Sequence, residues 1–231
     1  PSIMTVKIDR QSDRHPFPLI LPAQLRDLAE SYVVHKGEIE RVAGYDCQVI
    51  VLEPKDNLRY GQKLCAELAT GMLLKAKTFG EKNDMLETFA FTQIRIGGHI
   101  DREKVKPRFV ARAKAQDWRV EDSDAAEADL AQAGWTVRSQ PPGFRKVTEM
   151  TRTLNGASGV GHIVFSDGLA AVSVFIEPAA ARNTARQPGL SRQGAINVFA
   201  RQVDSYWVTV VGDAPAESVK LIANAVEHRK P

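Results

Sequence analysis

Residues 45–67 read YDCQVIVLEPKDNLRYGQKLCAE, and this stretch decides the fold that the sequence predicts. It holds two strand-sized runs, 45–52 and 58–67, on either side of a short polar link. The link contains proline, aspartate and asparagine, which are residue types that favour turns. Because a link of this length joins neighbouring antiparallel strands, the stretch predicts a β-hairpin.

Strand-like sequence continues on both sides of this hairpin. Further strand candidates lie at 33–42, 72–79 and 86–96, and a short helix is predicted over 19–32. The links are again short, so we expect a curved antiparallel meander with one face packed and one face free. Apolar residues of the meander are expected to share one face, as a lipid-sized groove or, alternatively, as ordinary core. They are Val49, Val51, Leu64, Leu73, Phe89 and Phe91.

Cys47 and Cys65 are the two cysteines of the sequence. If the hairpin turns around Asp56, they face each other across the two strands, within reach of a disulfide. A slip of one residue would place the sulfurs on opposite faces, so two buried free thiols are the alternative. A disulfide would indicate an oxidising compartment.

The sequence changes character between residues 98 and 132. Residues 117–129 carry six acids against one arginine and are rich in alanine, which predicts a linker that is partly helical over 124–133. A second β-rich region begins at Gly134 and ends in a predicted helix over 216–228. Its strand candidates are 135–138, 144–153, 161–166, 169–176, 195–202 and 206–211.

Two local features of this second region stand out. Asp167-Gly168 lies between apolar runs and predicts a two-residue hairpin turn. The stretch 179–194 reads as a long loop rich in alanine, arginine and glycine, and the four arginines between 178 and 202 have no acid among them. Arginine binds carboxylates and phosphates with two hydrogen bonds at once, so this stretch is a candidate docking surface for an acidic peptide or an anionic lipid headgroup. A solvated loop is the alternative.

Composition and motifs exclude several classes of function. The net charge is only +3, which argues against a polybasic nucleic-acid binder. The five histidines and two cysteines show no zinc-ligand spacing, and no nucleophile motif or dinucleotide-binding motif is present. The sequence therefore predicts a protein that is not an enzyme, with no catalytic residues, no metal site and no cofactor.

Short motifs follow one another in a fixed order along the chain. In the first half they are RYGxxLCxExxTGxxLK at 59–75 and LExFxFTxI at 86–94. In the second half they are GWxV at 134–137, PPGF at 141–144, FSDGLAxVSVF at 165–175 and VTVVGDxP at 208–215. This ordered set resembles the MucB/RseB family of periplasmic regulators of the sigma-E (AlgU-type) envelope-stress response.

The resemblance implies an α+β fold, mainly antiparallel β. Residues 1–110 are expected to be the C-terminal part of a domain like the lipid-binding carriers LolA and LolB, an incomplete β-barrel. A linker, 111–132, and a smaller β-rich domain with a C-terminal helix, 133–231, follow. The family's signal peptide and roughly the first half of its N-terminal domain have no counterpart here, so we expect the sequence to begin inside a larger protein.

The resemblance also implies a function. Members bind the periplasmic domain of an anti-sigma factor, RseA or MucA, and shield it from site-1 proteolysis, and lipopolysaccharide or another lipid is the releasing signal. We therefore expect a negative regulator in the periplasm that does not bind nucleic acid, with homo-oligomerisation left open. The alternative is a periplasmic lipoprotein- or lipid-carrier-like binding protein. A periplasmic address also favours the Cys47–Cys65 disulfide.

Candidate contacts with the anti-sigma factor come from two sources. Trp135 and Phe144 are aromatic positions of the family motifs, and the arginines are basic side chains of the same region. The full set is Trp135, Arg138, Phe144, Arg145 and Arg201.

Overall fold

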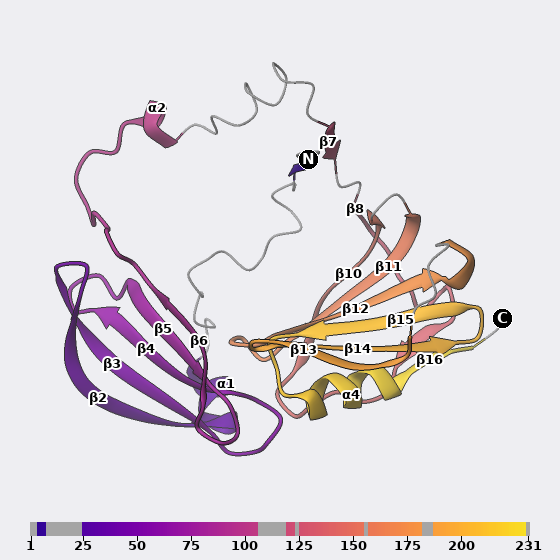
Figure 1. Cartoon of the computed structure of the whole chain (residues 1–231), viewed down its shortest axis with the longest axis horizontal. Coiled ribbons are helices and arrows are strands. Elements are labelled where there is room, and N and C mark those ends of the chain that lie inside the picture. The colour runs from indigo at the N-terminus through magenta and orange to yellow at the C-terminus, as the bar shows by residue number, and fades with distance from the viewer. Residues whose placement is uncertain are drawn as a thin grey trace.

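Two antiparallel sheets make up most of the protein, and they lie side by side in the computed structural model (Figure 1). The structure describes residues 4–7, 25–105, 119–122, 125–154, 157–181 and 187–229. In this part of the chain the strands pair antiparallel except for β1 with β7, helices are few, and neither large sheet closes into a barrel. The predicted fold class is therefore confirmed.

The first sheet has five strands in chain order, as expected for a meander. They are β2 (Tyr32–Val42), β3 (Tyr45–Pro54), β4 (Gly61–Glu67), β5 (Leu73–Phe79) and β6 (Met85–Ala90). In the tight β2–β3 turn, Ala43 and Gly44 have φ values of 48° and 89°, the positive values that a two-residue turn between twisted strands requires. The strand predicted over 86–96 is too long, because β6 ends at Ala90 and the apolar side chains of 91–96 pack back on the sheet.

The five-stranded sheet has two faces with different surroundings. Cross-strand partners share a face, and side chains alternate between faces along each strand. The face that carries Cys47 and Cys65 is called the disulfide face below. The opposite face carries Ile50 and Leu64, packs on helix α1 (Leu25–Ser31), and is called the α1 face. The helix predicted over 19–32 thus ends as expected, and its first part, 19–24, lies outside the described residues.

The two cysteines form a disulfide with a Cα–Cα distance of 5.3 Å, which confirms that prediction. The predicted register is wrong by two residues, because Cys65 lies opposite Val49 and Cys47 lies opposite Glu67. The loop between β3 and β4 runs from residue 55 to 60, so the turn is centred later than Asp56. A slip of two residues leaves both sulfurs on one face, and the disulfide therefore forms between diagonal positions.

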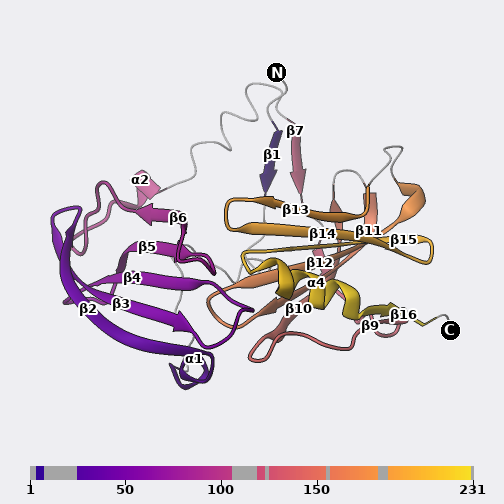
Figure 2. The ribbon, with the colours of Figure 1, turned by 60° about the horizontal axis from the view of Figure 1, so that its bottom comes forward.

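The second sheet has seven strands in the order β13-β14-β15-β12-β11-β10-β8. Their bounds are β8 (Ala125–Glu127), β10 (Arg145–Leu154), β11 (Ala157–Ser166), β12 (Ala171–Pro178), β13 (Gly189–Gln193), β14 (Ile196–Val203) and β15 (Tyr206–Gly212). Helix α4 (Ala216–Ala225) packs against β14 and β15 and crosses one face of this sheet (Figure 2). Val219, Ile222 and Ala223 on its apolar side are fully buried, as the predicted terminal helix requires.

Shorter elements complete the described chain. Helix α2 (Arg102–Val105) and the 3₁₀ turn η1 (Ala179–Ala181) are single turns. Strands β1 (Met4–Lys7) and β7 (Arg119–Asp122) pair with each other, and β9 (Trp135–Val137) pairs with β16 (Val226–His228). No helix in the described ranges is long and apolar enough to cross a membrane.

Three local predictions for the second region are wrong. The segment expected to be helical over 124–133 contains strand β8 and a turn, because Ala125 and Glu127 pair with β10. The stretch read as one long loop includes β13, which pairs along its length with β14.

The Asp167-Gly168 turn is a four-residue link, since Ser166 pairs with Ala171. The Asp167 carboxylate shapes this link by accepting hydrogen bonds from the two backbone N–H groups that follow Gly168.

His162 of β11 is a buried polar side chain on the sheet face opposite α4. Its ring stacks on Phe175 with 4.4 Å between the centroids. Neither ring nitrogen has a hydrogen-bond partner in the part of the chain that the structure describes. Burial, together with the nearby charge of Arg152, lowers the pKa of His162 to about 4.

The disulfide gives a direct prediction. Replacing both Cys47 and Cys65 by serine should lower the free energy of unfolding by about 3 kcal/mol, because the cross-link restricts the unfolded chain across an 18-residue separation. Denaturant titration of wild type and variant measures this, with reduced wild-type protein as a control that should match the variant. Two free thiols in denatured, unreduced protein would contradict the assignment.

His162 predicts a pH dependence of stability. Below about pH 6.5 the unfolded chain binds a proton at this imidazole, whereas the folded chain does not until about pH 4. The stabilising contribution is therefore complete above pH 6.5 and decreases by about 3 kcal/mol as the pH falls to 4. Denaturant titrations of wild type and His162→Leu across this range should diverge by that amount. Parallel curves would show that His162 does not titrate in this way.

Candidate functional site at the domain junction

Arg59 joins the two sheets. It lies in the β3–β4 loop, and its side chain is fully buried. Its Nη1 donates to the Asp167 carboxylate of the second sheet at 2.9 Å, while its Nε donates to Asp56 of its own loop at 3.0 Å. Its Nη2 donates to the backbone carbonyl of Pro142. One guanidinium thus binds groups from both halves of the chain, in the fork geometry that arginine provides.

Aromatic rings surround this ion pair. The guanidinium of Arg59 lies 5.6 Å from the ring centroids of both Tyr32 and Phe144. The Tyr32 hydroxyl donates to the Asp167 carboxylate at 3.3 Å. Burial and the adjacent Asp167 raise the pKa of Tyr32 above its usual value, so this hydroxyl stays protonated as a donor. The buried Asp167 carboxylate therefore accepts hydrogen bonds from both Arg59 and Tyr32.

The β3–β4 loop makes further contacts across the junction. The Tyr60 hydroxyl accepts a hydrogen bond from the buried Asn197 amide at 2.8 Å. The hydroxyl of Ser218, in α4, donates to the carbonyl of Leu58. Leu169 of the second sheet's hairpin packs in one apolar cluster with residues of α1 and the first sheet. Polar and apolar contacts together fix the loop 55–60 against the second domain.

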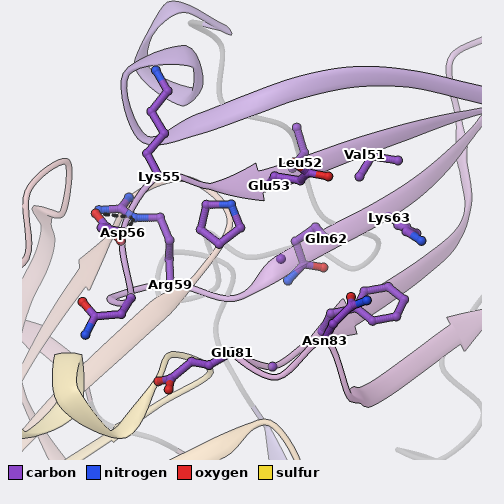
Figure 3. A pocket seen from close by; sticks show the side chains of 15 residues that line it. Val51, Leu52, Glu53, Lys55, Asp56, Arg59, Gln62, Lys63, Glu81 and Asn83 are labelled. Atoms are coloured by element: carbon purple, nitrogen blue, oxygen red, sulfur yellow. Dashed lines mark hydrogen bonds and ion pairs between the residues drawn. The ribbon is translucent and has the colours of Figure 1, made fainter.

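Two polar pockets border this loop. The first has a volume of about 540 Å³ and lies along the ends of β3 and β4, next to Arg59 and the β5–β6 turn (Figure 3). The second, of about 480 Å³, lies between the domains. Tyr60 and the β5–β6 turn form one wall of the second pocket, and Leu190, Arg192 and the start of α4 form the other. Acidic and basic side chains both line each pocket, which suits a charged peptide segment better than a purely apolar ligand.

The five predicted partner contacts do not form one surface. Trp135 is buried and stacks on His228, and Phe144 is buried beneath Arg59. Arg201 donates to the carbonyls of Ala223 and Val226 at the end of α4, where it satisfies the helix C-terminus.

The two other predicted contacts are exposed. Arg138 pairs with Glu227 at 2.7 Å, and Arg145 is exposed at the start of β10. Their role as partner contacts stays a prediction. Two further arginines of the basic stretch, at 182 and 186, lie outside the described residues.

The six lipid-facing candidates divide between the two faces of the first sheet. Val49 lies on the disulfide face with Val51, whereas Leu64 lies on the α1 face, where Leu73 packs and where Phe89 pairs with Ala76. Phe91 packs in the cluster around the disulfide. The expectation of one shared face is therefore wrong, because odd-numbered positions of β3 pair with odd-numbered positions of β4. A lipid-binding role for these residues stays a prediction.

The contact between Arg59 and Asp167 was not predicted from the sequence. Arg59 and Asp167 both lie in the quoted motifs, but a lone charged residue in a polar loop resembles any solvated one. Tyr32 lies between a helix and a strand, and its local sequence does not indicate that its hydroxyl donates to Asp167. Only the folded chain brings the three together.

Two arginine substitutions should lower the free energy of unfolding by different amounts. Arg59→Met leaves the Asp167 carboxylate buried without its cation and should lower the free energy of unfolding by about 3–5 kcal/mol. Arg41→Met is the matched control, because Arg41 pairs with Asp46 in an exposed position, where such a pair contributes about 1 kcal/mol or less. Denaturant titration measures both. Equal, small losses would mean that the Arg59 pair does not hold the domains together.

Comparison with known proteins identifies the family. The MucB/RseB N-terminal domain matches residues 1–109, and the MucB/RseB C-terminal domain matches residues 129–227. The sigma factor AlgU regulatory protein MucB of Pseudomonas aeruginosa is 31% identical over 212 residues, which cover 89% of this chain and 62% of MucB. The sigma-E factor regulatory protein RseB of Haemophilus influenzae is 22% identical, over 92% of this chain and 64% of RseB. The chain thus spans less than two thirds of the length of these relatives.

Solved structures agree with this comparison. A crystal structure of MucB in complex with MucA(peri) superimposes with a TM-score of 0.68 and 27% identity, over 91% of this chain and 72% of that one. A crystal structure of MucB gives a TM-score of 0.67 and 26% identity, over 89% of this chain and 66% of that one. These relatives are named as regulatory proteins, which confirms the prediction of a non-catalytic protein. The chain belongs to the MucB/RseB family.

Proposed function

We propose that this protein binds the periplasmic domain of an anti-sigma factor of the RseA/MucA type and thereby restrains a sigma-E response. The observation that carries this proposal is the superposition on MucB in complex with MucA(peri), which extends over both sheets. A protein that acts by binding needs a rigid surface, and the buried Arg59 junction supplies one by fixing the two domains against each other.

The binding surface in this proposal is the pocket between the domains. Its walls come from both halves of the chain, so a bound segment would contact the β5–β6 turn and the second sheet together. Glu81, Asp84 and Glu217 provide acceptors, and Lys82 and Arg192 provide donors. A peptide with both charge signs matches this lining.

The proposal also includes the compartment in which the protein acts and the signal that releases the anti-sigma factor from it. The disulfide between Cys47 and Cys65 supports an oxidising compartment, and hence the periplasm. A bound anti-sigma segment would be held away from a site-1 protease, because a protease needs an extended, accessible chain. A lipid or lipopolysaccharide would act as the releasing signal by favouring a state with lower affinity for the peptide.

A second candidate function is lipid or lipoprotein carriage. Val34 and Ile39 on the α1 face are 50% and 62% exposed, so both leave apolar surface uncovered on this face. An acyl chain would cover such side chains. Copurified acyl chains in native mass spectrometry would favour this role.

The binding proposal predicts a specific loss on mutation. The periplasmic segment of an RseA/MucA-type anti-sigma factor should bind the wild type and resist a site-1 protease in its presence. Leu190→Asp combined with Arg192→Glu, at the interdomain pocket, should weaken binding at least tenfold, or about 1.4 kcal/mol. Calorimetry and a proteolysis time course measure the two effects.

The control for this experiment is Lys36→Glu, on the first sheet and away from that pocket. It should bind and protect as the wild type does. Failure of the wild type to bind the segment, or equal binding by the pocket variant, would count against the proposal.

A further inference from the structure

Strand β13 forms a free edge of the second sheet (Figure 2). It pairs with β14 on one side, and no strand within the described ranges pairs with its other side. All five of its residues are exposed. The space around Gly189 is open, since no described residue beyond its chain neighbours lies within 4 Å of its Cβ position. The outer side of β13 is therefore accessible to a ligand.

The turn between β13 and β14 shows which backbone groups of β13 point outward. Gln193 pairs with Ile196 across a two-residue hydrogen-bonded turn, and successive pairs of antiparallel strands alternate between hydrogen-bonded and non-hydrogen-bonded. Ser191 therefore directs its N–H and C=O groups toward β14, as Gln193 does. Leu190 and Arg192 occupy the alternate positions, so their N–H and C=O groups point toward the open side.

The other three edges of the two large sheets are less suited to an added strand. Strand β8 has only three residues, and the pairing of β2 with β3 and of β6 with β5 contains an irregularity in each case. Short strands and bulges protect sheet edges from pairing with other chains. The register of β13 with β14 is continuous from Gly189 to Gln193, so β13 lacks a bulge and offers a regular edge.

The two residues with outward backbone groups also line the pocket between the domains. Leu190 and Arg192 form one wall of that pocket, on the sheet face that carries Phe199 and α4. Leu190 is 45% exposed, and Arg192 donates through Nε to the Gly194 carbonyl and forms no ion pair within the described part of the chain. Directly opposed residues of neighbouring strands share a face, so a strand added to β13 would project alternate side chains into the pocket.

We propose that the partner peptide binds in extended form along β13, as an additional strand of the second sheet. The peptide residue opposite Arg192 is acidic and the one opposite Leu190, two positions away, is apolar, because these side chains complement the pocket wall. In this binding mode backbone hydrogen bonds provide affinity and alternate side chains provide specificity. The proposal rests on the proposed function, in which the peptide belongs to an anti-sigma factor, and adds how that peptide is held.

N-methylation of the peptide backbone tests this arrangement. Synthetic peptides that tile the periplasmic domain of an RseA/MucA-type anti-sigma factor first locate the binding segment by calorimetry. Within it, an N-methyl group should weaken binding about tenfold or more at two positions that are two residues apart, because their N–H groups donate to the Leu190 and Arg192 carbonyls. The same group on the residue between them points away from β13 and should change the affinity less than about twofold.

Two substitutions at one position of the protein provide a matched comparison. Arg192→Pro removes an outward N–H group, whereas Arg192→Ala keeps it, and both remove the same charge. Proline is tolerated on the open side of an edge strand, so both variants should unfold at similar denaturant concentrations. Arg192→Pro should bind the peptide about fivefold to tenfold more weakly than Arg192→Ala does. The N-methyl series does not depend on how these variants fold.

Equal effects at all three N-methyl positions, or equal affinities of the two Arg192 variants, would overturn the proposal, because the backbone of β13 would then not bind the peptide. Binding of the intact periplasmic domain without binding of any short peptide would overturn it too, because an added strand binds as a short segment. These outcomes leave the proposed function in place. Failure of the intact domain to bind would overturn both proposals.

Discussion

The buried ion pair between Arg59 and Asp167 determines how the two domains of this protein meet. Removing two charges from water is costly, and the junction offsets that cost with donors and acceptors from several elements. Asp56 and the Pro142 carbonyl accept from the guanidinium, and the Tyr32 hydroxyl donates to Asp167. Each partner is needed because a buried charge without its full set of bonds destabilises the fold more than no charge at all.

The Arg59–Asp167 ion pair also determines part of the protein surface, because it fixes the loop 55–60. The loop that presents Arg59 also borders both pockets, one on the first domain and one between the domains. The two pockets also share Gly80 and Glu81 of the β5–β6 turn. A ligand in one pocket that displaced this loop would also change the wall of the other pocket, so the two pockets are linked through the loop.

The sequence predicted the parts of the fold that depend on local pattern. The meander, the terminal helix and the disulfide follow from strand-sized apolar runs, helical periodicity and the spacing of Cys47 and Cys65. Prediction from local sequence was wrong where pairing with a distant strand determines the secondary structure. In β8, an alanine-rich segment pairs with β10 instead of forming a helix. The contact between Arg59 and Asp167 could not be predicted from the sequence, because the two residues are 108 positions apart and neither has a local sequence pattern that indicates burial.

The disulfide has a consequence for the maturation of the protein. It ties together the two strands whose connecting loop carries Arg59, so it restrains the loop before the second domain docks. A chain that still holds free thiols must order that loop without a covalent restraint, at a greater loss of conformational entropy. Formation of the disulfide therefore lowers the entropic cost of assembling the two domains.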